Sequence, residues 1–316
     1  MSGVDPSAAV AKQTKLAAEI FDELYNKTFD GVGVTRASYG EGEQVASELL
    51  ESHAKKLGLV IDHDAAGNIY MTMRGESQEA PPIVIGSHID SVAQGGNFDG
   101  AAGVISGLIA CAGIIEKGIR LPQDIRVMGI RAEESAWFGV SYIGSRSALG
   151  TLPKDALDNA KRSDTGITLG EHMFKAGCNP DALRAGDIYL PPSSLKAYLE
   201  VHIEQGPVLD SKDLPLGIVT GIRGNRRLPS AQCIGEYSHC GGVPRSYRKD
   251  AVLAVTDLIS YLDKIWDECE RKGEDFAFTV GKFFTDKEWH AMTKISGAVE
   301  FSLDMRSLDG DFIESM

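Results

Sequence analysis

The sequence PIVIGSHIDSV at residues 82–92, followed closely by GGNFDG at residues 95–100, organises the rest of the chain. The apolar run indicates a short buried strand, and a glycine-rich turn comes after it. His88 and Asp90 stand at the carboxyl end of this strand, and Asp99 stands on the turn. Ligands of open α/β sheets bind at the carboxyl ends of the strands, so these side chains predict a site. Imidazole and carboxylate groups suit zinc, manganese and other first-row divalent ions.

These residues also have a structural interpretation. A histidine and an aspartate at a strand end are often only surface residues. Asp99 precedes a helix expected at residues 101–117, where a carboxylate favours the helix N-terminus without any metal. The capping role and the metal-binding role are compatible, so this stretch alone leaves both open.

Two further predicted strands end in polar side chains of the same kind. The strand at residues 125–130 leads into Glu133 and Glu134, and the strand at residues 195–201 leads into HIEQG, which begins at His202. Adjacent carboxylates are usually solvated. At a strand-to-loop transition, however, adjacent side chains diverge, so one can bind a metal while the other takes a proton from water. Three strands that end in histidine or carboxylate favour a single site.

The remaining pattern predicts an α/β fold with a mixed sheet and a second, smaller α+β unit. Residues 1–208 are expected to form a metal-binding catalytic domain and residues 209–316 a separate domain. Apolar residues at helical spacing indicate helices at 7–26, 41–57 and, in the second domain, 250–271. The other expected strands are a pair within 59–73 that turns at 66–68, and the runs at 217–222, 231–237, 276–284 and 298–306.

Composition narrows the class of protein. The formal net charge of −13 argues against a nucleic-acid partner, because phosphate binding depends on lysine and arginine. Five cysteines without a close pair fit a reducing compartment. The longest apolar segment, at about residues 103–115, is too short to cross a bilayer, and residues 1–6 lack a signal-peptide pattern. We therefore expect a cytoplasmic protein that acts on a small molecule, with no membrane partner.

The ordered motifs GSHIDSV, GGNFDG, EESxxF, HIEQGPVL and SHxGxxP resemble those of one family. They are similar to the hydantoinase/carbamoylase branch of the dinuclear-metal aminoacylase and carboxypeptidase superfamily. That branch includes N-carbamoyl-L-amino acid hydrolases, β-ureidopropionases and allantoate amidohydrolases. The resemblance runs from about residue 17 to residue 307, and HIEQGP is the most branch-specific motif. Peptidase relatives usually have a carboxylate where His202 stands.

The resemblance implies two divalent metal ions per subunit. His88 and His202 would bind one ion, Asp99 would bridge the two ions, and Glu134 would bind the second. Zinc, manganese, cobalt and nickel all suit such ligands. The implied reaction is hydrolysis of a linear amide or ureido C–N bond, most simply that of an N-carbamoyl-L-amino acid. The alternatives are a peptidase or aminoacylase of the same superfamily, and a catalytically incomplete dimerising fragment.

The resemblance also implies roles in catalysis. Glu133 would be the general base that deprotonates the attacking water and passes the proton to the leaving nitrogen. Asp90 would orient His88 from behind.

The second domain would be the lid and dimerisation domain of a homodimer. His239, on a glycine-rich turn, would reach across the dimer to stabilise the tetrahedral oxyanion, although a surface histidine or a cap is the alternative. Arg306 would pair with the substrate carboxylate, or would form only an ordinary surface ion pair. Gln205 would contact substrate. Thr293 stands where the family has a substrate-binding asparagine, which puts the usual carbamoyl substrate in question.

A second departure concerns the last metal ligand. Family members continue beyond the position that corresponds to Met316, and they supply a further metal-binding histidine. This sequence has no histidine after His290. We therefore expect that the catalytic domain and the lid are incomplete, that the second metal binds weakly, and that the 316-residue chain is poorly active or inactive.

Overall fold

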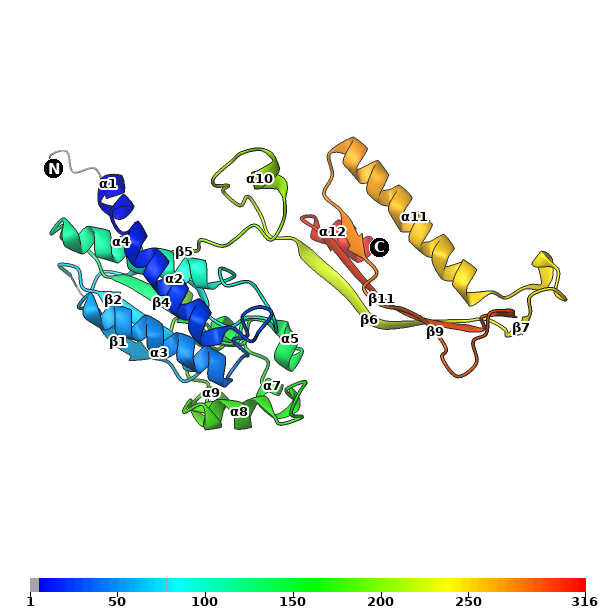
Figure 1. The fold of residues 1–316 in the computed structure, drawn as a ribbon, viewed down its shortest axis with the longest axis horizontal. Coiled ribbons are helices and arrows are strands. Elements are labelled where there is room, and N and C mark those ends of the chain that lie inside the picture. Colours follow the sequence, from blue (N-terminus) through cyan, green and yellow to red (C-terminus); the bar gives the residue numbers. More distant parts are fainter. Residues whose placement is uncertain (1–5, 78) are drawn as a thin grey trace. The chain divides into compact units, whose positions relative to one another are not determined.

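The computed structural model describes residues 6–77 and 79–316, and the chain divides into two compact units (Figure 1). The first unit is Met1–Val208 and the second is Leu209–Met316. Each unit has its own sheet and its own hydrophobic core. None of the described helices has the length and apolar character that spanning a membrane requires.

The first unit is built on a mixed five-stranded sheet in the order β1-β2-β4-β3-β5, which confirms the expected α/β class. Strand β3 is parallel to both of its neighbours, β4 and β5, whereas β2 is antiparallel to both β1 and β4. Because parallel strands end at the same edge, this order places the carboxyl ends of β3, β4 and β5 together. The strands are β1 Val60–His63, β2 Ile69–Met73, β3 Ile83–His88, β4 Ile125–Ile130 and β5 Ala197–Leu199.

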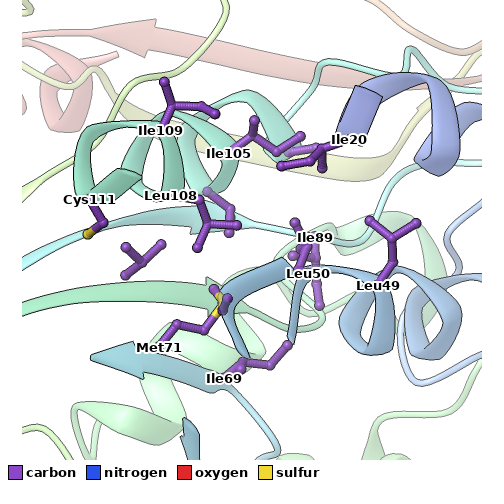
Figure 2. Close-up of a cluster of buried hydrophobic side chains, with 14 of the residues drawn as sticks. Ile20, Leu49, Leu50, Ile69, Met71, Ile89, Ile105, Leu108, Ile109 and Cys111 are labelled. Carbon is purple, nitrogen blue, oxygen red and sulfur yellow. The ribbon is translucent and has the colours of Figure 1, made fainter. Parts of the chain in front are cut away.

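Three long helices cover this sheet and close its core. Figure 2 shows Ile20, Leu50 and Leu108, one from each helix, among the buried side chains that meet Ile69 and Met71 of β2. Each fully buried aliphatic side chain contributes about 1.5–3 kcal/mol. The helices are α2 Thr14–Thr28, α3 Glu41–Lys56 and α4 Ala101–Glu116.

Helix α4 lies unusually close to the sheet because small residues face it. A Cβ at Gly103 would lie 2.4 Å from the Val201 carbonyl oxygen and 2.6 Å from the Ser87 Cβ. A Cβ at Gly107 would lie 2.9 Å from Val127. Glycine therefore lets the beginning of α4 approach the ends of β3 and β5, where the polar residues gather.

Short helices form the rest of the first unit, and several of them pack in a second cluster of buried residues that includes Phe138, Leu157 and Met173. The expected helix at 7–26 is interrupted, because the Thr14 hydroxyl donates to the Ala11 carbonyl and competes with the helical pattern. The short helices are α1 Pro6–Ala11, α5 Ser135–Phe138, α6 Ile143–Ala148, α7 Ala156–Asn159, α8 Leu169–Lys175, α9 Pro180–Arg184 and the 3-10 helix η1 Pro192–Ser194.

The second unit packs one long helix, α11, against an antiparallel sheet, as the sequence predicts. Leu262 and Cys269 of the helix lie in the same core as Phe301 and Met305 of β11. The Asp250 side chain accepts from the Val252 and Leu253 amides and caps the helix. The elements are α10 Val208–Ser211, β6 Gly224–Ile234, β7 Ser238–His239, η2 Arg245–Tyr247, α11 Ala251–Lys272, β8 Ala277–Thr279, β9 Phe283–Thr285, β10 Lys294–Ile295, β11 Ala298–Ser307 and α12 Gly310–Ser315.

Several expected strand boundaries are wrong. Residues 217–222 form no strand, although Ile218 and Ile222 alternate with other residues as a strand would. These side chains are 93% and 89% exposed, and no described strand pairs with this segment. The strand instead begins at Gly224 and ends at Ile234. The run at 276–284 is two short strands rather than one.

Candidate metal centre

The end of strand β3 and the turn before helix α4 form the base of the site. His88 is the last residue of β3 and is buried. Gly100 has a φ of +66°, and a Cβ there would lie 2.5 Å from the ring atoms of His88. The turn therefore lies directly against the imidazole and brings Asp99 beside it. Asp99 does not cap α4, because Gly100 occupies the cap position and no side chain makes a cap bond there. The capping interpretation of Asp99 is wrong.

Three potential metal-ligand atoms converge at this edge of the sheet. His88 Nε2 lies 3.7 Å from Asp99 Oδ1, and His202 Nε2 lies 3.3 Å from the same oxygen. The two Nε2 atoms are 3.4 Å apart. His88, Asp99 and His202 were all predicted from sequence, and within the described part of the chain they form a group whose ligand atoms lie within 4.8 Å of one another.

Hydrogen bonds around these atoms indicate that the site fits a cation. His88 Nδ1 lies 2.9 Å from the Asp90 carbonyl oxygen, and His202 Nδ1 lies 2.8 Å from the Ile203 carbonyl oxygen. A carbonyl only accepts, so each Nδ1 carries a proton, and each ring in its neutral form presents a lone pair at Nε2. Asp99 Oδ1 is buried and has no hydrogen-bond partner among the described residues. Three electron pairs thus face one another without a donor, which is the arrangement that a metal ion satisfies.

The charges of the site also favour a cation. Burial lowers the pKa of His88, but the nearby carboxylates of Asp90 and Asp99 and the hydrogen bond to the Asp90 carbonyl outweigh burial and raise the pKa to about 10. The interaction with His88 lowers the pKa of Asp99, and the hydrogen bond from Gln205 adds to this effect. Without a metal, a proton on His88 relieves the excess negative charge. A divalent ion competes with that proton for the same nitrogen.

Substituting alanine for Gly100 should disturb this site specifically. The new Cβ would clash with the His88 ring, and a positive φ strains any L-residue with a side chain. We expect a loss of about 1–3 kcal/mol of stability and weaker metal binding, measured by thermal unfolding and metal titration. The control is Gly96→Ala, because a Cβ at Gly96 meets nothing within 4 Å. Equal effects of the two substitutions would contradict the close packing described for His88.

Asp90 is completely buried and holds the loop after β4. Its carboxylate accepts from the Glu133 amide at 3.0 Å, the Glu134 amide at 3.1 Å and the Ser38 hydroxyl at 2.7 Å. Its Oδ1 is 3.5 Å from His88 Nδ1, farther than its own carbonyl oxygen. Orientation of His88 by the carboxylate of Asp90 stays a prediction. The contact with Ser38 was missed, because nothing in the local pattern marks that serine.

The two adjacent glutamates have different neighbours. The Ser145 hydroxyl, on helix α6, lies 2.8 Å and 3.0 Å from the two carboxylate oxygens of Glu133. Burial raises the pKa of Glu133 to about 7, against the hydrogen bond from Ser145. Burial also raises the pKa of Glu134, and the charge of His88 opposes this shift. Glu134 does not join the three-residue ligand group found in the described residues. Sequence reasoning missed Ser145, whose only signal is its place at the start of a helix that follows the glutamates.

Gln205 lies beside the ligand group. Its Nε2 donates to Asp99 Oδ2 at 2.7 Å, and its φ is +54°. The structure thus shows Gln205 orienting Asp99. A contact between Gln205 and substrate stays a prediction.

The remaining predicted site residues lie in the second unit and are exposed. His239 Nδ1 accepts from the Gly241 amide, and strands β7 and β10 bring His239 close to Thr293. Arg306 Nη2 lies 3.0 Å from Asp304 Oδ2 on the same strand. Their roles in substrate binding stay predictions.

Comparisons with known proteins agree with the motifs. Residues 68–168 match the model of peptidase family M28. The chain is 38% identical over 279 residues to an N-carbamoyl-L-amino acid amidohydrolase of Geobacillus stearothermophilus, covering 88% of this chain and 66% of that protein. It is 32% identical over 285 residues to such an amidohydrolase of Paenarthrobacter aurescens, covering 90% and 67%. The chain thus spans about two thirds of the length of these curated relatives.

Solved structures show the same fold. A hydantoinase/carbamoylase family amidase from Burkholderia multivorans superimposes with a TM-score of 0.83 at 28% identity, covering 95% of this chain and 70% of that one. One from Burkholderia ambifaria gives a TM-score of 0.80 at 29% identity, covering 95% and 71%. The resemblance inferred from the motifs is therefore confirmed, and the chain belongs to the hydantoinase/carbamoylase family.

Proposed function

We propose that this protein is a metal-dependent hydrolase that cleaves a linear amide or ureido C–N bond, with an N-carbamoyl-L-amino acid or a related ureido acid as substrate. The observation that carries the proposal is the convergence of acceptor atoms from His88, Asp99 and His202, near the partly buried carboxylate of Glu133. The names of the relatives, which include N-carbamoyl-L-amino acid amidohydrolases and an allantoate amidohydrolase of Bacillus subtilis, support the substrate class.

His88, Asp99 and His202 would hold one divalent ion. Asp99 would bridge to a second ion at Glu134, whose surroundings are also rich in negative charge. Zinc, manganese, cobalt and nickel suit the ligands equally. When bound, such ions supply Lewis acidity, which polarises a carbonyl group and lowers the pKa of water.

Glu133 would move the proton. Its carboxylate would accept a proton from the attacking water and deliver it to the leaving nitrogen. A carboxylate with a pKa near the working pH suits this exchange, because it can both accept and release the proton. Ser145 would hold the carboxylate in place.

The second unit would bind substrate and form a homodimer. Arg306 would exchange its contact with Asp304 for the substrate carboxylate, since a planar guanidinium suits bidentate binding. His239 on strand β7 and Thr293, just before strand β10, would contact the reacting group, and Gln205 of the first unit would also contact it. We also place the protein in the cytoplasm, because its odd number of cysteines fits a reducing compartment.

A peptidase or aminoacylase activity is the second candidate, and the match to peptidase family M28 favours it. His202 argues against it, because the peptidase relatives usually carry a carboxylate at that position.

The test compares hydrolysis of N-carbamoyl-L-amino acids, N-acetyl-L-amino acids and dipeptides at equal concentrations. We expect ammonia release from the carbamoyl substrates to be at least about tenfold faster than hydrolysis of the others, to stop on chelation and to return when Mn²⁺ or Zn²⁺ is added. Faster dipeptide or acetyl hydrolysis would favour the second candidate. Metal-loaded protein without any turnover would reject both activities for the 316-residue chain and favour a catalytically incomplete dimerising fragment.

A further inference from the structure

Four consecutive backbone amides behind the candidate base share an unusual arrangement. The amides of residues 131–134 all donate to side-chain oxygens. The acceptors are Asn68 Oδ1 for residue 131 at 2.9 Å, Glu43 Oε1 for residue 132 at 2.8 Å, and the two oxygens of Asp90 for residues 133 and 134. Asn68, Glu43 and Asp90 are each fully buried. This segment therefore takes its conformation from side chains of other elements.

The backbone turns sharply within this segment. Ala132 has a φ of +53°, a left-handed conformation that is uncommon for residues other than glycine. Such a conformation persists only when the surroundings determine it. Ala132 immediately precedes Glu133, so the turn decides where the Glu133 carboxylate points. The side chain that accepts from the Ala132 amide is Glu43.

Glu43 connects this turn to a second loop. Its Oε2 accepts from the Tyr39 amide at 2.7 Å and from Arg131 Nε at 2.8 Å, and Arg131 Nη2 lies 2.8 Å from it as an ion pair. Ser38, the neighbour of Tyr39, donates to Asp90. Glu43 and Asp90 thus both bind the segment at residues 131–134 and the loop at residues 38–39.

Glu43 differs from Asp90 in one respect. Asp90 lies against His88, whereas no hydrogen bond joins Glu43 to His88, Asp99 or His202 in the described part of the chain. The hydrogen bond from the Ala132 amide is the most direct link between Glu43 and Glu133, the next residue.

We propose that Glu43 is a positioning residue: through the amide of Ala132 it fixes the turn that directs the carboxylate of Glu133, without contact with metal or substrate. The inference rests on the proposed function, in which Glu133 is the general base. It adds a buried residue, without a hydrogen bond to any of the three ligand side chains in the described part of the chain, on which the rate depends.

The test is Glu43→Gln. Glutamine keeps the size of the side chain and one acceptor oxygen. That oxygen would face the donors of Tyr39 and Arg131, and the NH₂ group would then oppose the Ala132 amide, donor against donor. We expect amide hydrogen exchange at residues 132–134 to be about tenfold faster or more, and exchange within β3 and β4 to be unchanged. With metal restored, kcat should fall about 10- to 100-fold while KM and metal content stay within about twofold, because misplacement of a catalytic group acts on the chemical step.

Two further variants separate positioning from stability. Glu48→Gln makes the same chemical change on the exposed face of the same helix and should match the wild type. Arg131→Lys keeps a cation beside Glu43 and leaves its bond to the Ala132 amide, so it should retain most of the kcat. If Arg131→Lys loses as much kcat as Glu43→Gln, the ion pair rather than the turn matters and the proposal is wrong.

Exchange measurements on the wild type keep the inference testable even if Glu43→Gln does not fold. The Ala132 amide should then exchange as slowly as the amides of β4, and rapid exchange would overturn the proposal. Absence of hydrolysis by the metal-loaded wild type would reject the proposed function, while leaving the exchange result intact. An active wild type with an unchanged kcat in Glu43→Gln would reject only the positioning role.

Discussion

Replacing Glu133 with glutamine is expected to lower kcat for an N-carbamoyl-L-amino acid by about 10²- to 10⁴-fold, with bound metal unchanged. Glutamine has the same shape and can still accept the hydrogen bond from Ser145 through its oxygen. It cannot take a proton from water. The variant therefore removes the chemistry of the side chain and little else. The measurement is steady-state ammonia release, with metal content determined on the same samples.

The same residue predicts the pH dependence of the wild type. Burial raises the pKa of Glu133 to about 7. A general base works only when it is deprotonated, so kcat/KM should fall as the pH decreases through this range. A nearby cation stabilises the carboxylate, so the midpoint should lie at or below about 7. The residual rate of Glu133→Gln should lack this dependence on Glu133.

The matched control is Glu48→Gln, since Glu48 is exposed on helix α3 and lies outside the site. It should retain the wild-type rate and pH profile. Two results would reject the role of Glu133: a Glu133→Gln rate within a few fold of wild type, or a wild-type rate that stays flat down to about pH 4, the ordinary range of a glutamate.

The second large effect is expected for metal binding. His202→Ala should lower the affinity for the first metal ion by more than about 100-fold. Loss of even a residue that only supports a ligand lowers metal affinity by about 10- to 100-fold. The His202 side chain is 32% exposed, so its removal should leave the fold intact, whereas His88 is buried. The measurement is metal content by elemental analysis after dialysis against a weak chelator.

The control for this experiment is His63→Ala. His63 is also partly exposed, and it makes an ion pair with Glu51 away from the ligand group. It should keep the wild-type metal content. If His202→Ala retains metal as tightly as His63→Ala does, the ligand group identified here does not hold the ion.

The sequence was sufficient to predict that the polar residues at the ends of parallel strands lie together. His88 and His202 are 114 positions apart, yet each follows a recognisable strand, and the parallel order of β3 and β5 brings them together. Asp99 followed from the glycine-rich turn. Their chemistry is therefore visible in local patterns, because type and spacing suffice to place them at one edge.

The residues that support the site could not be predicted from local sequence patterns. Glu43 is separated from Ala132 by 89 positions, and Ser145 from Glu133 by 12, and no local pattern relates the members of either pair.

Whether a segment forms a strand depends more on pairing with a neighbouring strand than on apolar alternation. Residues 217–222 alternate like a strand and lack a partner in the described sheets, whereas β11 is ordered by neighbours on both sides.

The shortness of strand β5 has a consequence for how tightly the proposed metal ion would be held. This edge strand pairs with β3 over only three residues, Ala197–Leu199, and His202 follows three positions later. An ion bound by both His88 and His202 would close a loop of about a hundred residues between them. It would thereby hold strand β5 at the edge of the sheet. Local opening of this edge and release of the ion would then be coupled. Each tenfold rise in free metal above its dissociation constant would add about 1.4 kcal/mol to the free energy of opening.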